Sequence, residues 1–170
     1  MKFLNKFILF FFLSIISFNS SIANEKTALI DVNYIIQNSN IGKKVLKKIE
    51  ILNNKNITQL EKKNKELNNL ESKIQNKKNI ISDEEFNNEV KAFRQKAQDF
   101  TNEKNQTVKN FKNFQKKELE KVFKLLNPII SNYMKQNSLN ILLDSKNVFM
   151  SNNDINITEE ILKIINDEIK

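Results

Sequence analysis

The chain contains no cysteine and no histidine. Without cysteine there is no disulfide, no thiolate metal site and no lipidated cysteine. Without histidine, the commonest general base and the commonest metal ligand are missing. The sequence also lacks a phosphate-binding Gly-x-x-x-x-Gly-Lys loop. We therefore expect a protein that is not an enzyme and that carries no catalytic, metal or cofactor site.

Glycine and proline are almost absent, with one of each in 170 residues, at Gly42 and Pro128. Compact α/β and all-β domains need many turns, and turns depend on these two residue types. Asparagine is abundant and can serve the few turns that remain. The composition predicts one domain with few turns and long helices.

Acidic residues are outnumbered, 20 against 28 basic ones, which gives a formal net charge of +8. Residues 43–81 carry +7, residues 83–127 carry +2, and the rest of the chain after residue 23 sums to −3. A basic balance favours anionic partners such as nucleic acid, a membrane surface, or an acidic protein or lipid. Nucleic acid is disfavoured because Arg94 is the only arginine and base readout relies on arginine.

The first residues have the three parts of a secretory signal peptide. Lys2 and Lys6 give a positive start, residues 7–16 form an apolar run broken by one serine, and small residues end at Ala23. Cleavage after Ala23 leaves Asn24 as the first residue of the mature chain. The alternative is an uncleaved membrane anchor, but a spanning helix needs about 20 apolar residues and this run is shorter. Export without disulfides suits a bacterial periplasm.

Two apolar repeats with a period of seven residues predict a pair of long helices packed along each other. The first repeat consists of Leu60, Leu67, Ile74 and Ile81; it lies in a predicted helix of residues 43–78 and ends just beyond it. The second repeat consists of Phe86, Phe93 and Phe100.

The residues between the two repeats predict where one helix ends and the next begins. Ser82 can accept a hydrogen bond from the free amides of a new helix, and Glu85 can reach back to the serine amide, which is the pattern of a capping box. The link of residues 79–81 is short and implies antiparallel neighbours. Further along, Pro128 lacks an N–H group and should kink the second helix or end it locally.

Short β-branched segments at both ends of the chain predict strands at residues 27–32, 139–143 and 148–150. Thr158 is predicted to cap a last helix of residues 159–168. Because the strands come from both chain ends, the helical pair must leave a small body and return to it.

The predicted fold class is α+β and mostly α. We expect a long antiparallel helical hairpin, forming coiled-coil arms, to project from a small β body that both chain ends build. The predicted divisions are residues 1–23 as signal peptide, 24–42 and 128–170 as body and oligomerisation domain, and 43–127 as the arm with its tip near 78–83.

The order of these segments resembles the Skp/OmpH family of periplasmic chaperones. The strand at residues 28–32, then residues 35–36 and residues 42–43, are similar to the family's strand, helical turn and Gly-Lys pair before the first arm helix. Residues 81–86 look like the family's arm turn. Residues 139–150 look like its closing strands.

The resemblance covers residues 27–168, including a helix start at residues 156–161 that is similar to the family's Asp-Ile-Thr start. The sequence departs from the family at Asn156, where aspartate is frequent. It also departs at Asn137 and Ser138, where a glycine usually closes the long helix. Asparagine can adopt the left-handed conformation that such a turn requires.

The resemblance implies a homotrimer in which three bodies form a small β-barrel and three hairpins surround a cavity. It implies that the cavity holds unfolded outer-membrane proteins in the periplasm and that no ATP is used. Two alternatives stay open. One is a structural coiled-coil protein of the periplasm or anchored in the inner membrane. The other is an anion binder for lipopolysaccharide or an anionic membrane surface.

Lysine stems with charged ends, and phenylalanines that the helical seam leaves free, are candidates for contact with a client or an anion. The alternative is that the lysines form a solvated face and the phenylalanines only join the two helices. The arm candidates are Lys62, Lys63, Lys73, Lys77, Lys78, Phe86, Phe93 and Phe100. The candidates for body or oligomer contacts are Leu29, Ile30, Val32, Ile141, Leu143 and Phe149.

Overall fold

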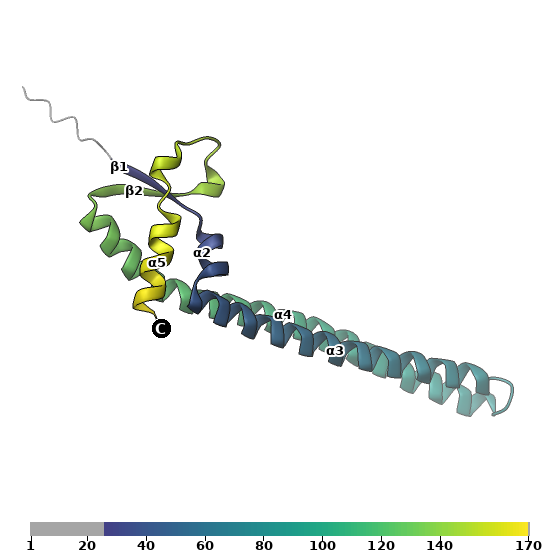
Figure 1. Cartoon of the computed structure of the whole chain (residues 1–170). Helices are drawn as coiled ribbons and strands as arrows, with labels where there is room; N and C mark the ends of the chain where they lie inside the picture. The colour runs from purple at the N-terminus through teal and green to yellow at the C-terminus, as the bar shows by residue number, and fades with distance from the viewer. Residues whose placement is uncertain (1–25, 170) are drawn as a thin grey trace, which may run out of the picture.

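The structure, a computed structural model, describes residues 26–169. Figure 1 shows a small body at one end and a long two-helix arm that reaches away from it. The predicted cleavage site at Ala23 and Asn24 lies outside the described residues. The elements are β1 (Lys26–Ile30), α2 (Val32–Asn38), α3 (Asn40–Lys77), α4 (Asp83–Gln136), β2 (Leu139–Asp144) and α5 (Thr158–Glu168).

Both arm helices begin at a serine that satisfies free backbone amides. The Ser39 side chain accepts a hydrogen bond from the N–H of Gly42 at 3.1 Å and starts α3. At the tip, Ser82 accepts from the N–H of Glu85 at 3.3 Å, and Glu85 reaches back to the N–H of Ser82, so the predicted capping box is confirmed. With 38 residues, α3 is about 57 Å long at about 1.5 Å per residue.

The body is built around a two-stranded sheet whose strands come from opposite ends of the chain. β1 and β2 run parallel, with Leu29 opposite Leu143 and Ile30 opposite Asp144. At the other edge of β1, the N–H of Ile157 donates to the carbonyl of Leu29 at 2.9 Å. The predicted fold class is confirmed: the protein is mostly α, and its helical hairpin leaves a small body that both ends of the chain build.

The hydrophobic core lies where the arm enters the body. α5 packs against both α2 and α4, so the last helix holds the root of the arm to the first part of the chain. Burial of one large aliphatic side chain stabilises a fold by about 1.5–3 kcal/mol. The most deeply buried apolar side chains are Ile35, Val122, Leu126, Ile161 and Ile165.

Two predictions about the strands are wrong. Residues 148–150 form no strand: a short 3₁₀ turn, Ser145–Asn147, follows β2, and within the described chain no neighbouring strand offers these residues a hydrogen-bonding partner. Val32, predicted as the last residue of a strand, opens α2 instead and packs against the core. The helix starts there because the Asp31 side chain accepts from the N–H of Tyr34 at 2.9 Å.

Pro128 does not end α4, which continues to Gln136. Lys124, whose carbonyl loses its usual helical partner, is exposed together with Pro128, so water can satisfy that carbonyl. Beyond the proline, Ile129 and Tyr133 are buried in the core. Their packing holds the helix together past a position at which the local sequence favours a stop.

At Asn137, Ser138 and Asn156, where the sequence departs from the family pattern, the expected turn and helix start are both present. Ser138, rather than Asn137, takes the left-handed conformation after α4, with φ at 54°. Thr158 is the first residue of α5 and not its cap, which corrects the prediction. The amide oxygen of Asn156 accepts from the N–H of Thr158 at 3.0 Å, so it supplies the acceptor that an aspartate would supply there.

Candidate functional site

The seam between α3 and α4 is where the two apolar repeats meet, and most of its side chains are only half-buried. Leu60 and Leu67 on α3 and Phe86, Phe93 and Phe100 on α4 each keep part of their surface in solvent. Two packed helices leave the flanks of the seam between them open to solvent. The phenylalanines therefore join the helices and also leave apolar surface open; their contact with a client stays a prediction.

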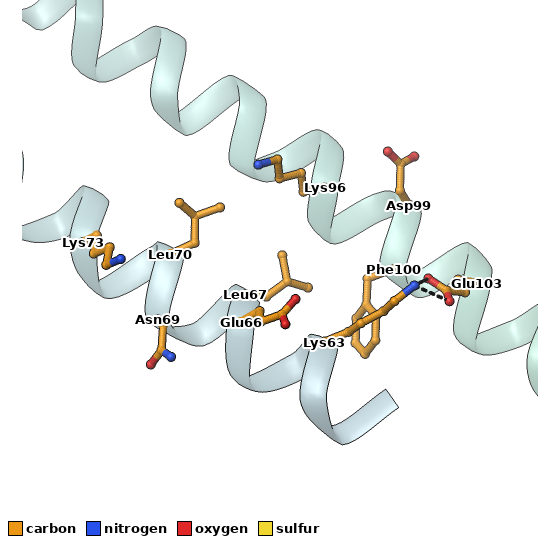
Figure 2. Close-up of a pocket in the computed structure, with 10 residues that line it drawn as sticks. All are labelled: Lys63, Glu66, Leu67, Asn69, Leu70, Lys73, Lys96, Asp99, Phe100 and Glu103. Atoms are coloured by element: carbon orange, nitrogen blue, oxygen red, sulfur yellow. Dashed lines mark hydrogen bonds and ion pairs between the residues drawn. The ribbon is translucent and has the colours of Figure 1, made fainter. Parts of the chain in front are cut away.

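Midway along the arm, the helices leave an open cleft of about 550 Å³. Leu67 and Leu70 point from α3 toward α4, and Phe100 comes from α4 (Figure 2). These three side chains form the apolar part of what we call the mid-arm cleft. Its polar lining consists of Lys63, Glu66, Asn69, Lys73, Lys96, Asp99 and Glu103.

Ion pairs tie the two arm helices together beside the cleft and near the tip. The ammonium of Lys63 lies 2.5 Å and 2.6 Å from the two carboxylate oxygens of Glu103, as the dashed lines in Figure 2 mark. Lys77 lies 2.6 Å from Glu89. Both pairs are half exposed, so each contributes little to stability, about 1 kcal/mol at most.

The predicted arm residues divide between the cleft and the tip. The mid-arm cleft brings together Lys63, Lys73 and Phe100. Lys62 lies beside it, in a smaller hollow of about 310 Å³ that Lys63 also lines. The other four predicted residues do not line the cleft and lie nearer the tip: Lys77, Lys78, Phe86 and Phe93.

At the root of the arm, a carboxylate is buried within the helical seam. Glu118 is 5% exposed, accepts a hydrogen bond from Lys121 on its own helix, and lies 3.9 Å from Lys48 on α3. The Lys121 hydrogen bond lowers the pKa of Glu118, against the opposing effect of burial. Further along α4, within the body, burial and a 2.6 Å hydrogen bond to Glu160 raise the pKa of Tyr133 to about 12.

Further apolar side chains are exposed along the arm, and the groove that two of them line was missed by the sequence analysis. Ile57 on α3 is 45% exposed, and Val108 and Phe123 on α4 are 44% and 37% exposed. A groove of about 390 Å³ runs along α4, and Leu119 and Phe123 line it. Those two residues are four positions apart, a spacing that places them on one helical face and could have predicted the groove.

Among the predicted body residues, Val32 is partly buried against the core, and the others fall into two groups. Leu29 and Ile30 are buried within the chain's own core, each 3% exposed. Ile141, Leu143 and Phe149 face solvent, and Phe149 is fully exposed. The second group alone can contact another molecule without unfolding the body.

The body has a polar hollow of about 390 Å³ whose lining includes Asp31, Tyr34 and Glu159. A hydrogen bond with the Glu159 carboxylate raises the pKa of Tyr34. Within residues 26–169, no group of three or more acidic side chains is arranged to hold a metal ion. In the same range, no helix combines the length and apolar character that a membrane crossing requires.

The fold and its open seam define a class of protein in which a small α/β body carries one long helical hairpin. A family model described as "Outer membrane protein (OmpH-like)" matches residues 26–165. The chain belongs to the OmpH-like family. Among solved structures, it is similar to an OmpH-like protein of Caulobacter crescentus CB15 whose name describes an outer membrane chaperone, with 19% identity, a TM-score of 0.73 and 85% of each chain covered. No curated protein matches the chain.

Proposed function

We propose that the protein is an ATP-independent holdase chaperone that binds unfolded outer-membrane proteins in the periplasm and keeps them soluble. The observation that best supports this function is the exposure of apolar side chains along the arm. Between Ile49 and Ile74 on α3, none of the described side chains is buried, although apolar residues recur along this stretch. An extended apolar surface that solvent can reach is typical of a binding surface rather than of a fold's interior.

The chemistry of this surface suits loose binding of many different chains. Each half-buried leucine or phenylalanine offers a small apolar contact, and neighbouring lysine stems add apolar surface with a charged end. Several such contacts along one arm add through effective concentration, while each stays weak enough for release without ATP. The family membership and the chaperone name of the Caulobacter relative support the same function.

The body supports a homotrimer as the working assembly. A two-stranded sheet is marginal by itself, and within the described chain the outer edge of β2 has no strand partner. Ile141 and Leu143 on β2 are 40% and 43% exposed, and Phe149 extends from the following loop. If Phe149 of one copy packs on β2 of the next and this head-to-tail contact repeats with a rotation that closes after three copies, the result is a ring of three.

The test is an aggregation assay with the exported, mature protein and a denatured outer-membrane β-barrel protein. The holdase function predicts that about three chains per client keep it soluble without nucleotide, in line with a closed ring of three. A barrel protein that precipitates as fast as in buffer would rule out the holdase function. It would leave a structural coiled-coil role, in the periplasm or at the inner membrane, as the better explanation.

A second candidate function is binding of lipopolysaccharide or an anionic membrane surface. It is favoured by the exposed lysines of α3 outside the mid-arm cleft, which we call the lysine-rich face: Lys43, Lys44, Lys47, Lys48, Lys55, Lys62, Lys65 and Lys77. Residues 43–81 carry a charge of +7. Within residues 26–169, Lys62 and Lys78 make no ion pair, so their charges are available. This candidate predicts that binding to anionic vesicles weakens steeply between low and high salt. Binding that does not respond to salt would leave the lysines as a solubilising face.

A further inference from the structure

The mid-arm cleft differs in charge from the arm around it. The surrounding segment, residues 43–81, is strongly basic at +7. The charged groups of the cleft are three lysines and three carboxylates, so its formal charge is zero. A ligand with a net negative charge therefore has less reason to bind here than on the lysine-rich face of α3. The formal charge of the cleft therefore suits a ligand that has no net charge.

The walls of the cleft offer both hydrogen-bond donors and acceptors. Lys63 and Glu103 are occupied by their mutual ion pair, and Asp99 already accepts from Gln95 at 3.0 Å. Within residues 26–169 the other charged groups of the wall form no ion pair, which leaves ammonium groups and a carboxylate for a ligand. These groups are Lys73, Lys96 and Glu66.

The floor of the cleft is apolar and half-buried, formed by Leu67, Leu70 and Phe100. Figure 2 shows the two leucines directed into the gap between the helices. A volume of about 550 Å³ falls in the range of ordinary ligand sites. The cleft thus combines an apolar floor with walls of mixed polarity, and it is open to solvent along the side of the arm.

We propose that the mid-arm cleft binds an extended, amphipathic segment of polypeptide, an inference that rests on the proposed holdase function. The strands of outer-membrane barrels alternate apolar and polar residues. In the unfolded chain, their backbone N–H and C=O groups lack partners from neighbouring strands. The apolar side chains of such a segment lie on the floor, and its backbone groups meet the donors and acceptors of the walls. A helical segment satisfies its own backbone and gains nothing from those walls.

The primary test uses a fluorescent peptide of about ten residues, the length of one barrel strand, with alternating valine and threonine and no net charge. The variant Leu70→Asn removes apolar floor. Its matched control is Leu125→Asn, since Leu125 is also a leucine, is 46% exposed on α4 and lines neither the cleft nor the groove on α4. We expect Leu70→Asn to weaken peptide binding roughly fivefold to tenfold and Leu125→Asn to leave it unchanged. Equal affinities in the two variants overturn the proposal.

A second measurement uses the unmodified protein, so that it does not depend on either variant folding. The same peptide carries a photoreactive group, and the cross-linked residues are identified by mass spectrometry. The proposal predicts cross-links within residues 63–73 and 96–103, and affinity that changes little with salt because the lining is neutral. Cross-links on the lysine-rich face instead, with affinity that falls as salt rises, overturn it.

The two proposals fail in different ways. If the unmodified protein keeps a barrel protein soluble while the peptide cross-links elsewhere, the cleft is wrong and the holdase function stands. If the peptide binds in the cleft and the barrel protein still aggregates as in buffer, the cleft is right and the holdase function is wrong.

Discussion

The backbone N–H of Asp31 donates a hydrogen bond to the side-chain oxygen of Thr158 at 2.8 Å, across 127 residues of sequence. The Thr158 hydroxyl in turn donates to the side chain of Asn156 at 2.6 Å. Asp31 caps α2 and Thr158 opens α5, so this chain of bonds joins the two ends of the body on either side of the arm. The body therefore depends on a small polar contact as well as on its apolar core.

Replacing Thr158 with valine should destabilise the protein. Valine keeps the shape but has no oxygen, so the N–H of Asp31 loses its partner in a partly buried site. The expected loss is about 1–2 kcal/mol, read as a lower midpoint in urea unfolding. The control is Thr58→Val: Thr58 is exposed and bonds only to a carbonyl of its own helix, so a similar loss there would contradict the explanation.

Gly42→Ala should also destabilise the protein, by about 3 kcal/mol. A Cβ atom at Gly42 would lie 1.9 Å from the carbonyl oxygen of Ile36, because α2 and α3 meet at a sharp corner there. Relief requires the backbone to move. Thermal unfolding measures the loss, and Lys44→Ala, an exposed change in the same helix, should shift the stability by less than about 0.5 kcal/mol. Equal melting temperatures for the two variants would show that the corner can relax freely.

The arm was predictable from the sequence because its determinants are local. The apolar repeats and the Ser82–Glu85 pattern each depend on residues within a few helical turns, and local geometry decides them. Pro128 shows the limit of such reasoning. Its local preference for a stop is outweighed by the packing of Ile129 and Tyr133, which depends on elements distant in sequence.

The body and the cleft were harder to predict because both depend on contacts between residues that are distant in sequence. Residues 148–150 have the composition of a strand, but a strand needs a partner, and composition does not supply one. The cleft gathers residues from α3 and α4 whose pairing depends on the register between the helices. Lys63 and Phe100 were both candidates, yet nothing in the sequence placed them in one cleft.

Ser82→Ala should loosen the tip of the arm without unfolding the body. It removes the acceptor for the N–H of Glu85 and one half of the capping box. A cap of this kind contributes about 1 kcal/mol, so amide hydrogen exchange should quicken in residues 83–86. The control is Ser72→Ala, since Ser72 is exposed in mid-helix and donates only to the carbonyl of Asn68. Faster exchange in the body as well would contradict a local effect.

The buried Glu118 should make stability depend on pH. Its pKa in the folded protein is lowered from the ordinary value of 4.5, mainly by the hydrogen bond from Lys121. The unfolded state therefore binds a proton first as pH falls. The stability that Glu118 contributes is complete above the unfolded pKa and is lost as the pH drops through the lower, folded pKa.

The measurement is urea unfolding of the natural protein and of Glu118→Gln between about pH 6 and about pH 3, on either side of ordinary carboxylate pKa values. The difference in stability between the two proteins should shrink as the pH falls. Glu120→Gln is the matched control, because Glu120 is exposed and lies 3.9 Å from Lys116 on the same helix. A constant difference for Glu118→Gln across this range would show that its carboxylate keeps no preference for the charged form.

Phe149→Ser tests the proposed trimer with the least risk to the fold. Phe149 is fully exposed within one chain, so its loss removes no packing from the body, whereas Leu29 or Ile30 would disturb the core. If Phe149 contacts the exposed Ile141 and Leu143 of a neighbouring copy, the serine variant exposes that apolar patch and weakens the ring. Native mass spectrometry should then show trimer for the natural protein and a shift toward monomer for the variant.

Ile80→Ser is the matched control for that experiment. Ile80 is 79% exposed, but it lies in the turn at the tip of the arm, at the opposite end of the hairpin from the body (Figure 1). A general loss of exposed apolar surface would affect both variants alike, whereas a body interface is sensitive only to Phe149. Trimers that persist in Phe149→Ser and dissociate in Ile80→Ser would move the interface from the body to the arm tips, and the arms could then not open around a client.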